Sequence, residues 1–254
     1  MPSNYIICST QRSGSSFFCE CLSRAGCLGT PAEWLVFLEF NASSLGSEDA
    51  ELKNKPLAEV IRERAERQRN LSGSEVIGWK IMWSTMTHMK GKLKRENDAI
   101  LNSDFIATVF EQPKFIYFER SNKIAQAISH VILSKTQISH VRDEHQLETF
   151  ESKKVQLDIK NDEITTFLRK QLADERGWTA FFQQNNIDPL RIVYEDFCND
   201  VAAGVTNVAQ FLDVVIDDSA LSEVSRSLTL RKTRSEFERD LAQRYLTSLV
   251  NLTG

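Results

Sequence analysis

Long apolar runs are missing from this 254-residue sequence. No run approaches the roughly 20 apolar residues that a helix needs to span a bilayer. The N-terminal residues, Met1 to Asn4, also lack the basic start and apolar run of a signal peptide. We therefore expect a cytoplasmic location and no stable insertion into a membrane.

Cysteine is scarce, with five residues in the whole chain. An odd number of cysteines without a secretory signal argues against a disulfide framework. The spacing of Cys19, Cys21 and Cys27 matches none of the common zinc motifs. Cys21 falls on the same helical face as Phe17 and Phe18, so we expect buried thiols and no bound metal.

A large excess of charge is also missing, since 31 Lys and Arg against 35 Asp and Glu give a formal net charge of −4. This balance provides no overall attraction to nucleic acid or to an anionic membrane, and we expect neither partner. An anion site must therefore come from local placement of Arg, Lys and backbone N–H groups. Internal repeats are absent, and the length predicts a single domain over residues 1–254.

Strand-forming segments alternate with helical patterns along the chain. Strands are predicted at residues 5–9, 76–83, 114–119 and 190–194. Helices are predicted at 17–25, 57–69, 84–93, 124–132, 156–185 with a break near Gly177, 200–213 and 219–248. This order predicts an α/β fold with a mostly parallel central sheet flanked by helices.

Two polar stretches, 41–55 and 141–154, show little apolar periodicity. We predict surface loops in both places, and the second is either a solvated loop or a mobile lid. Together with residues 91–104, they are expected to shape the pocket for a substrate.

The segment from Thr10 to Ser16 joins the first predicted strand to the first helix. A helix N-terminus leaves backbone N–H groups free and carries partial positive charge, so it stabilises an anion. Gly14 lets the backbone approach a ligand closely. Further donors are the side chains of Arg12, Ser13, Ser15 and Ser16. The alternative is a serine-rich turn with an ordinary helix cap.

This loop is not a Walker A motif, which needs two glycines and a Lys before the hydroxyl residue. Here Gly14 is the one glycine, no Lys is present, and no strand ends in an obvious Mg²⁺-binding Asp. The sequence therefore lacks the main residues that a P-loop-like kinase or NTPase needs. It stays an alternative, as does a non-catalytic module that binds a nucleotide or a sugar.

Two sequence blocks carry a resemblance to a known family. The segment TQRSGSSF, residues 10–17, resembles the 5′-phosphosulfate loop of sulfotransferases. It is most similar to the bacterial carbohydrate branch that includes mycobacterial trehalose sulfotransferase, which has S-Q-R-S-G-S-T there. Arg120 at the end of the third strand, with Ser129 on the next helix, resembles the 3′-phosphate site, although Ser121 stands where the branch commonly has Pro.

Weaker matches continue along the chain. GWKIMW at 78–83 is similar to the G-G-K-L-M-W stretch of the branch, and residues 175–182 and 194–197 also resemble family segments. Residues 231–237 look like its late cofactor-contacting stretch. The resemblance thus covers nearly the whole chain in order.

The resemblance implies a P-loop NTPase-like sulfotransferase fold. The implied donor is 3′-phosphoadenosine 5′-phosphosulfate (PAPS), without a metal, and the implied acceptor is a hydroxyl of a carbohydrate or glycolipid. The mycobacterial relatives dimerise, so a homodimer is a further expectation. The implied nucleotide-binding residues are Gln11, Arg12, Ser13, Gly14, Ser15, Ser16, Arg120, Ser129, Arg234 and Ser235.

Sulfuryl transfer to an alcohol needs a base for the acceptor proton and cations around the sulfuryl oxygens. Arg12 and Lys80 suit the second role. Residues 30–34, TPAEW, resemble the P-x-E-F/W stretch whose Glu is the proposed base of the branch. We therefore predict Glu33 as the general base. The competing candidates are Glu39, His88 and His130.

Overall fold

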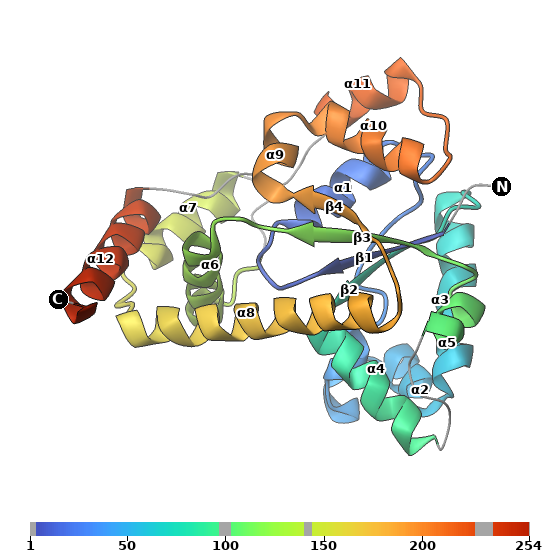
Figure 1. Ribbon diagram of the computed structural model, residues 1–254, viewed down its shortest axis with the longest axis horizontal. Coiled ribbons are helices and arrows are strands. Elements are labelled where there is room, and N and C mark those ends of the chain that lie inside the picture. Colours follow the sequence, from blue (N-terminus) through green and yellow to red (C-terminus); the bar gives the residue numbers. More distant parts are fainter. Residues whose placement is uncertain (1–3, 97–102, 140–143, 227–235, 254) are drawn as a thin grey trace.

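The computed structural model describes residues 4–96, 103–139, 144–226 and 236–253. Within these residues, a four-stranded sheet lies at the centre in the order β2-β1-β3-β4 (Figure 1). The strands are β1 (Tyr5–Ser9), β2 (Gly78–Met82), β3 (Lys114–Glu119) and β4 (Leu190–Val193). Every pairing is parallel, so the carboxyl ends of the strands meet at one edge, and the predicted α/β class is confirmed.

Helices pack against both faces of the sheet, as a parallel sheet requires (Figure 1). One face is covered by α1 (Ser15–Arg24), α9 (Tyr194–Asn199), α10 (Val201–Phe211) and α11 (Asp218–Arg226). The other face is covered by α3 (Leu57–Ser72), α4 (Trp83–Arg95), α5 (Ser103–Val109) and α8 (Asn161–Gln184).

A third group of helices lies beyond the carboxyl ends of the strands (Figure 1). It consists of α6 (Lys123–Thr136), α7 (Glu144–Lys154) and α12 (Glu236–Thr253), which share an apolar cluster with one end of α8. Among the helices of the described residues, none combines the length and apolarity needed to cross a bilayer.

Strand β1 is buried along its whole length. Its side chains alternate, with Ile6 and Cys8 in one core cluster and Tyr5 and Ile7 in the other. A strand that is covered on both faces has a continuous run of apolar residues. The predicted strand at residues 5–9 therefore has the same bounds as β1. Full burial of a side chain as large as Ile6 or Ile7 stabilises the fold by about 1.5–3 kcal/mol.

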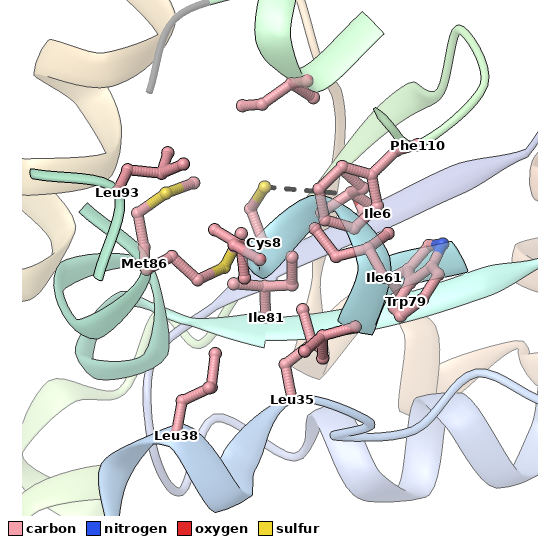
Figure 2. Close-up of a cluster of buried hydrophobic side chains, with 14 of the residues drawn as sticks. Ile6, Cys8, Leu35, Leu38, Ile61, Trp79, Ile81, Met86, Leu93 and Phe110 are labelled. Atoms are coloured by element: carbon pink, nitrogen blue, oxygen red, sulfur yellow. Dashed lines mark hydrogen bonds between the residues drawn. The ribbon is translucent and has the colours of Figure 1, made fainter. Parts of the chain in front are cut away.

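The larger cluster lies on the α3 and α4 side of the sheet. Figure 2 shows side chains of β1 and β2 meeting Ile61 of α3, Met86 and Leu93 of α4, and Leu35 and Leu38 of the chain after α1. Leu38 belongs to a short 3-10 helix, η1 (Val36–Glu39), and a second one, η2 (Ala42–Ser44), follows. This packing fixes the segment after α1 against the edge strand β2.

The prediction of loops at residues 41–55 and 141–154 is wrong, because both stretches contain a helix. Residues 41–55 contain α2 (Ser47–Asn54), and residues 144–154 form α7, while 141–143 lie outside the described residues. Helix α2 buries only Leu52, and α7 buries only Phe150 and Lys154. Helices with so few buried positions show no apolar periodicity, so the pattern could not reveal them.

The predicted break near Gly177 is also wrong, since α8 runs without interruption from Asn161 to Gln184. A Cβ atom at Gly177 would lie 2.1 Å from the Trp83 ring. The glycine therefore allows a close approach between α8 and the start of α4. Trp83, predicted as the end of the second strand, is the first residue of α4.

All five cysteines are free thiols. Cys8, Cys19 and Cys21 are buried, which confirms the prediction for Cys19 and Cys21. The prediction for Cys27 is wrong, because this residue is partly exposed, as is Cys198. Burial raises the pKa of Cys19 and of Cys21 to about 12. These two thiols are therefore unreactive core groups.

Candidate active site

The loop between β1 and α1 has the geometry of an anion-binding turn. Arg12 and Gly14 both have positive φ, at 62° and 97°. Gly14 is the N-cap residue of α1 and offers no side-chain oxygen to the N–H groups of the first turn. A Cβ atom at Gly14 would lie 2.2 Å from the Tyr194 ring, so only glycine fits here. The strand, the turn and the helix N-terminus together favour a bound anion.

The serines of this loop have different partners. Ser13 is buried, its Oγ lies 2.7 Å from Ser9 Oγ, and it accepts a hydrogen bond from the Ser15 N–H at 3.3 Å. The Ser13 hydroxyl therefore braces the loop from inside. Ser16 Oγ instead accepts a hydrogen bond of 2.9 Å from Lys80 Nζ.

Lys80 of β2 also forms an ion pair with Glu33, with 2.8 Å between Nζ and Oε1. The Lys80 side chain is only 6 % exposed, against 31 % for Glu33. One buried ammonium group thus contacts both the predicted base and the predicted phosphosulfate loop.

Glu33 reaches Lys80 because its own segment runs beside β2. Ala32 forms a parallel bridge with Trp79, and the Lys80 N–H donates to the Ala32 carbonyl at 2.9 Å. The Trp34 indole N–H donates to the Thr30 carbonyl at 3.0 Å and closes the turn. β2 is the edge strand of the sheet, so its free side is available for this extra pairing.

The predicted 3′-phosphate residues, Arg120 and Ser129, both contact Arg12, which was predicted to lie near the sulfuryl oxygens. Arg12 Nε donates to Ser129 Oγ at 3.0 Å, and Arg12 Nη1 donates to the Ser139 carbonyl at 2.8 Å. Arg120 Nη1 donates to the Arg12 carbonyl at 3.3 Å. Burial and the nearby Arg120 lower the pKa of the Arg12 guanidinium, since both disfavour its charge. Two guanidinium groups and a serine hydroxyl therefore gather beside the loop, as an anion site requires.

The first two residues of α9 hold Arg120 in place. Its guanidinium lies 5.0 Å from the centre of the Tyr194 ring, and its Nε lies 3.9 Å from Glu195 Oε1. Glu195 also accepts the backbone N–H groups of Ser121 and Asn122 at 2.9 and 3.0 Å. Burial alone would raise the pKa of Glu195, but these hydrogen bonds outweigh it and lower the pKa.

Sequence reasoning missed two positioning groups. Gln126 of α6 is buried, and its Nε2 donates to Thr10 Oγ1 at 2.9 Å and to the Gln11 carbonyl at 2.7 Å. The Trp178 indole N–H of α8 donates to the Ser9 carbonyl at 2.9 Å. The signal available for Gln126 was a polar residue among the apolar positions of α6, and for Trp178 it was the family resemblance of residues 175–182.

The competing bases have other partners. Glu39 accepts hydrogen bonds from Ser84 Oγ, at 3.0 Å, and from Thr85 Oγ1, both in the first turn of α4. His88 is exposed, with Nδ1 2.9 Å from the Ser84 carbonyl. His130 is buried and stacks on Phe167 with ring centres 4.1 Å apart. Glu33 is the candidate that contacts Lys80.

The predictions for Arg234 and Ser235, and the prediction that no metal is bound, are not tested by the structure. Arg234 and Ser235 lie outside the described residues. Within the described residues, no three His, Cys, Asp or Glu side chains gather as metal ligands would.

A family model described as Stf0 sulphotransferase matches residues 4–248. The chain belongs to the Stf0 sulphotransferase family. It is a sulfotransferase enzyme, and its parallel sheet, with a loop that joins β1 to α1, is the predicted P-loop NTPase-like sulfotransferase fold. Membership also confirms the resemblance on which the predicted site residues depend.

Two relatives of this Stf0 chain are each named trehalose 2-sulfotransferase. The protein from Mycobacterium tuberculosis (strain Erdman) is 24 % identical over 238 residues, covering 86 % of both chains. The protein from Mycolicibacterium smegmatis is 21 % identical over 232 residues, covering 83 % of this chain and 84 % of the relative. Among solved structures, a sulfotransferase from Alicyclobacillus acidocaldarius aligns with a TM-score of 0.48 and 14 % identity, covering 99 % and 94 % of the two chains.

Proposed function

We propose that this Stf0 family enzyme transfers a sulfuryl group from PAPS to a hydroxyl of a carbohydrate or glycolipid. The observation that carries the proposal is the double contact of Lys80. Its Nζ lies 2.8 Å from Glu33 Oε1 and 2.9 Å from Ser16 Oγ. A base, a cation and an anion loop are thereby connected at a single atom.

The loop residues fit the phosphosulfate end of the donor. The N–H groups of the first turn of α1 and the Ser16 hydroxyl provide donors, and Gly14 leaves room for a close backbone approach. Lys80 stabilises the negative charge that develops on the bridging oxygen as its bond to sulfur breaks.

Glu33 is proposed to act on the acceptor. It accepts the proton of the acceptor hydroxyl while that oxygen forms a bond to sulfur. The products are the sulfate ester and adenosine 3′,5′-bisphosphate. The ion pair with Lys80 holds Glu33 at the loop, and orientation of this kind lowers the barrier of a two-substrate reaction.

The 3′-phosphate of the donor is assigned to Arg120 and Ser129. Both lie within hydrogen-bond reach of Arg12, through its carbonyl and its Nε. A guanidinium and a hydroxyl beside a second guanidinium form charge-assisted hydrogen bonds with a phosphate. Tyr194 and Glu195 keep Arg120 oriented toward this position.

The carbohydrate acceptor is supported by the names of the two mycobacterial relatives, which act on trehalose. The cytoplasmic location, the homodimer and the independence from metal stay predictions.

A product assay tests the proposal. The purified enzyme is incubated with PAPS and a panel of neutral oligosaccharides without added metal, and products are detected by mass spectrometry. We expect a mass increase of one sulfate ester on at least one acceptor, together with release of adenosine 3′,5′-bisphosphate. Phosphorylation of an acceptor with ATP and Mg²⁺, without sulfation by PAPS, would instead favour a kinase.

A further inference from the structure

The loop between β1 and α1 is hydrogen-bonded to two helices behind it. Gln126 Nε2 of α6 donates to the Gln11 carbonyl at 2.7 Å and to Thr10 Oγ1 at 2.9 Å. The Trp178 indole N–H of α8 donates to the Ser9 carbonyl at 2.9 Å. The side chains of Gln126 and Trp178 are both 0 % exposed. Two buried side chains therefore bind three successive residues where the strand becomes the loop.

The amide of Gln126 can bind the loop in one orientation only. Its NH2 group has two N–H donors, and both are used on the loop. Exchange of the amide oxygen and nitrogen would place two acceptors, Gln126 Oε1 and the Gln11 carbonyl, against each other. Oε1 itself is buried and has no hydrogen-bond partner among the described residues. The two bonds to the loop therefore fix this side chain, although its oxygen stays unpaired.

The Gln11 carbonyl belongs to the peptide unit that precedes Arg12. Arg12 has a φ of 62°, and a residue other than glycine keeps such a left-handed conformation only when its surroundings hold it. A change of φ at Arg12 to the common negative range would turn this peptide unit relative to the rest of the loop and disturb the bond to Gln126. The hydrogen bond of 2.7 Å therefore stabilises the positive φ of Arg12.

This conformation determines where the N–H groups of the loop point. The C=O and N–H of a trans peptide unit point in opposite directions, so the Arg12 N–H points away from Gln126. Residues in left-handed and turn conformations bring successive N–H groups into a concave surface that binds anions. The loop has positive φ at Arg12 and again at Gly14, directly before the first turn of α1. The bond to the Gln11 carbonyl thus orients N–H donors for an anion.

We propose that Gln126 and Trp178 are positioning residues that hold this loop in its anion-binding conformation and thereby set the affinity of the enzyme for the 5′ end of the nucleotide. The inference rests on the proposed function, because that function assigns the 5′-phosphosulfate to the same loop. A loop that is already ordered loses less conformational entropy when a ligand binds. Removal of either hydrogen bond should therefore weaken binding of a 5′-phosphate and leave binding of a 3′-phosphate unchanged.

Calorimetric titration of Gln126→Met tests the inference. Met keeps the length of the side chain and removes both N–H donors. We expect adenosine 5′-monophosphate and adenosine 3′,5′-bisphosphate to bind about tenfold more weakly, as the loss of one hydrogen bond implies. Affinity for adenosine 3′-monophosphate should stay within about twofold of wild type, because Arg120 and Ser129 are unchanged. Equal losses for the two mononucleotides, or no loss for any nucleotide, would overturn the inference.

Gln171→Met is the matched control. Gln171 of α8 is 2 % exposed, and neither of its amide atoms has a partner in the part of the chain that the structure describes. On α8 it lies between Phe167, which stacks on His130 of α6, and Glu175, which pairs with Lys123 of α6. The substitution thus removes a buried amide from the same interface without removing a bond to the loop. All three affinities should match wild type, and a selective loss for the 5′-mononucleotide would contradict the inference.

Trp178→Phe tests the second hydrogen bond and does not depend on the folding of the first variant. Phe keeps an aromatic ring in the core and removes the indole N–H. The ratio of the affinities for the 5′- and 3′-mononucleotides should fall by about threefold to tenfold. Urea unfolding measures the stability of each variant separately. A variant that is less stable but keeps the wild-type ratio would show a structural role alone and would contradict the inference.

The wild-type enzyme separates the two levels of failure. If it binds none of the three nucleotides, the proposed function itself fails. If it binds them, and the ratio of the two mononucleotide affinities is the same in wild type, Gln126→Met and Trp178→Phe, only the inference about these two side chains fails. A lower ratio in both variants, with the wild-type ratio in Gln171→Met, is the result that we expect.

Discussion

Glu33 and Lys80 are joined by an ion pair of 2.8 Å between Oε1 and Nζ, although they come from a loop and from a strand. The same Nζ donates to Ser16 Oγ at 2.9 Å. Glu33 also lines a cavity of about 430 Å³, so the pair joins this cavity to the loop between β1 and α1. Because of these contacts, we expect different effects from substitutions at the individual residues of the site.

Glu33→Gln should abolish most turnover while leaving nucleotide binding intact. Loss of a general base lowers kcat by about 10²–10⁴-fold, and Gln keeps the size of the side chain. The measurements are the sulfation rate and calorimetric titration with adenosine 3′,5′-bisphosphate. Glu39→Gln is the control, because Glu39 bonds to the start of α4. A Glu33→Gln enzyme with wild-type kcat would remove Glu33 as the base.

Lys80→Ala should lower kcat by about 10²-fold or more, because charge on the departing oxygen loses its stabilising partner. Lys80→Arg should not restore the rate, since the planar guanidinium does not replace a buried ammonium that contacts two groups at one atom. Single-turnover kinetics with PAPS measure both variants. Full activity of the Arg variant would show that any cation suffices.

Arg120→Ala should weaken binding of adenosine 3′,5′-bisphosphate by about 10–100-fold, the cost of losing a charged hydrogen bond. Affinity for adenosine 5′-monophosphate, which lacks the 3′-phosphate, should change far less. The control is Arg191→Ala, because Arg191 lies over the Tyr117 ring and is 52 % exposed. Equal losses for both nucleotides would place Arg120 elsewhere in the site.

Gly14→Ala should destabilise the protein more than Gly26→Ala. Both glycines have positive φ, but an added Cβ collides with Tyr194 only at Gly14 and meets nothing within 4 Å at Gly26. We expect the positive φ to cost about 1 kcal/mol at both positions, with a further loss of about 1–3 kcal/mol at Gly14. Urea unfolding measures the difference. Similar stabilities would mean that Tyr194 moves aside freely.

His130 should contribute to loss of stability in acid. Burial, with Lys170 and Arg12 nearby, lowers its pKa to about 4, below its ordinary value of about 6.5. The unfolded chain therefore binds a proton at a higher pH than the folded one. The contribution of His130 is present above pH 6.5 and is lost as the pH falls toward 4.

His130→Gln removes this group, so the free energy of unfolding should fall less steeply between pH 6.5 and 4. Urea unfolding at several pH values measures the slope. Because the ring is buried against Phe167, the variant also loses stability at pH 7, and only the slope is diagnostic. An identical slope in the two proteins would contradict the prediction.

The sequence predicted those parts of the site that depend on the order of strands, loops and helices along the chain. The run at β1 and the polar turn with Gly14 fix a strand, a loop and a helix, and the alternation of strands and helices places their ends together. The contact of Arg12 with Ser129 could not be predicted, because it depends on how far α6 lies from the loop.

Other features depend on packing between distant segments. Gln126 and Glu195 bond to backbone groups whose positions only the folded chain defines. The cavity beside Glu33 requires α2, a helix with a single buried apolar residue that gives no periodic signal. The sequence therefore predicted the residues of the loop between β1 and α1 better than the shape of the cavity beside Glu33.

The central claim is that two phosphates of one nucleotide bind at the carboxyl ends of the strands. Binding of adenosine 3′,5′-bisphosphate in the absence of metal is its most direct test. Calorimetry should show that it binds at least about tenfold more tightly than adenosine 5′-monophosphate or adenosine 3′-monophosphate, since each phosphate adds charge-assisted hydrogen bonds. No binding, or equal affinity for the three nucleotides, would contradict the claim.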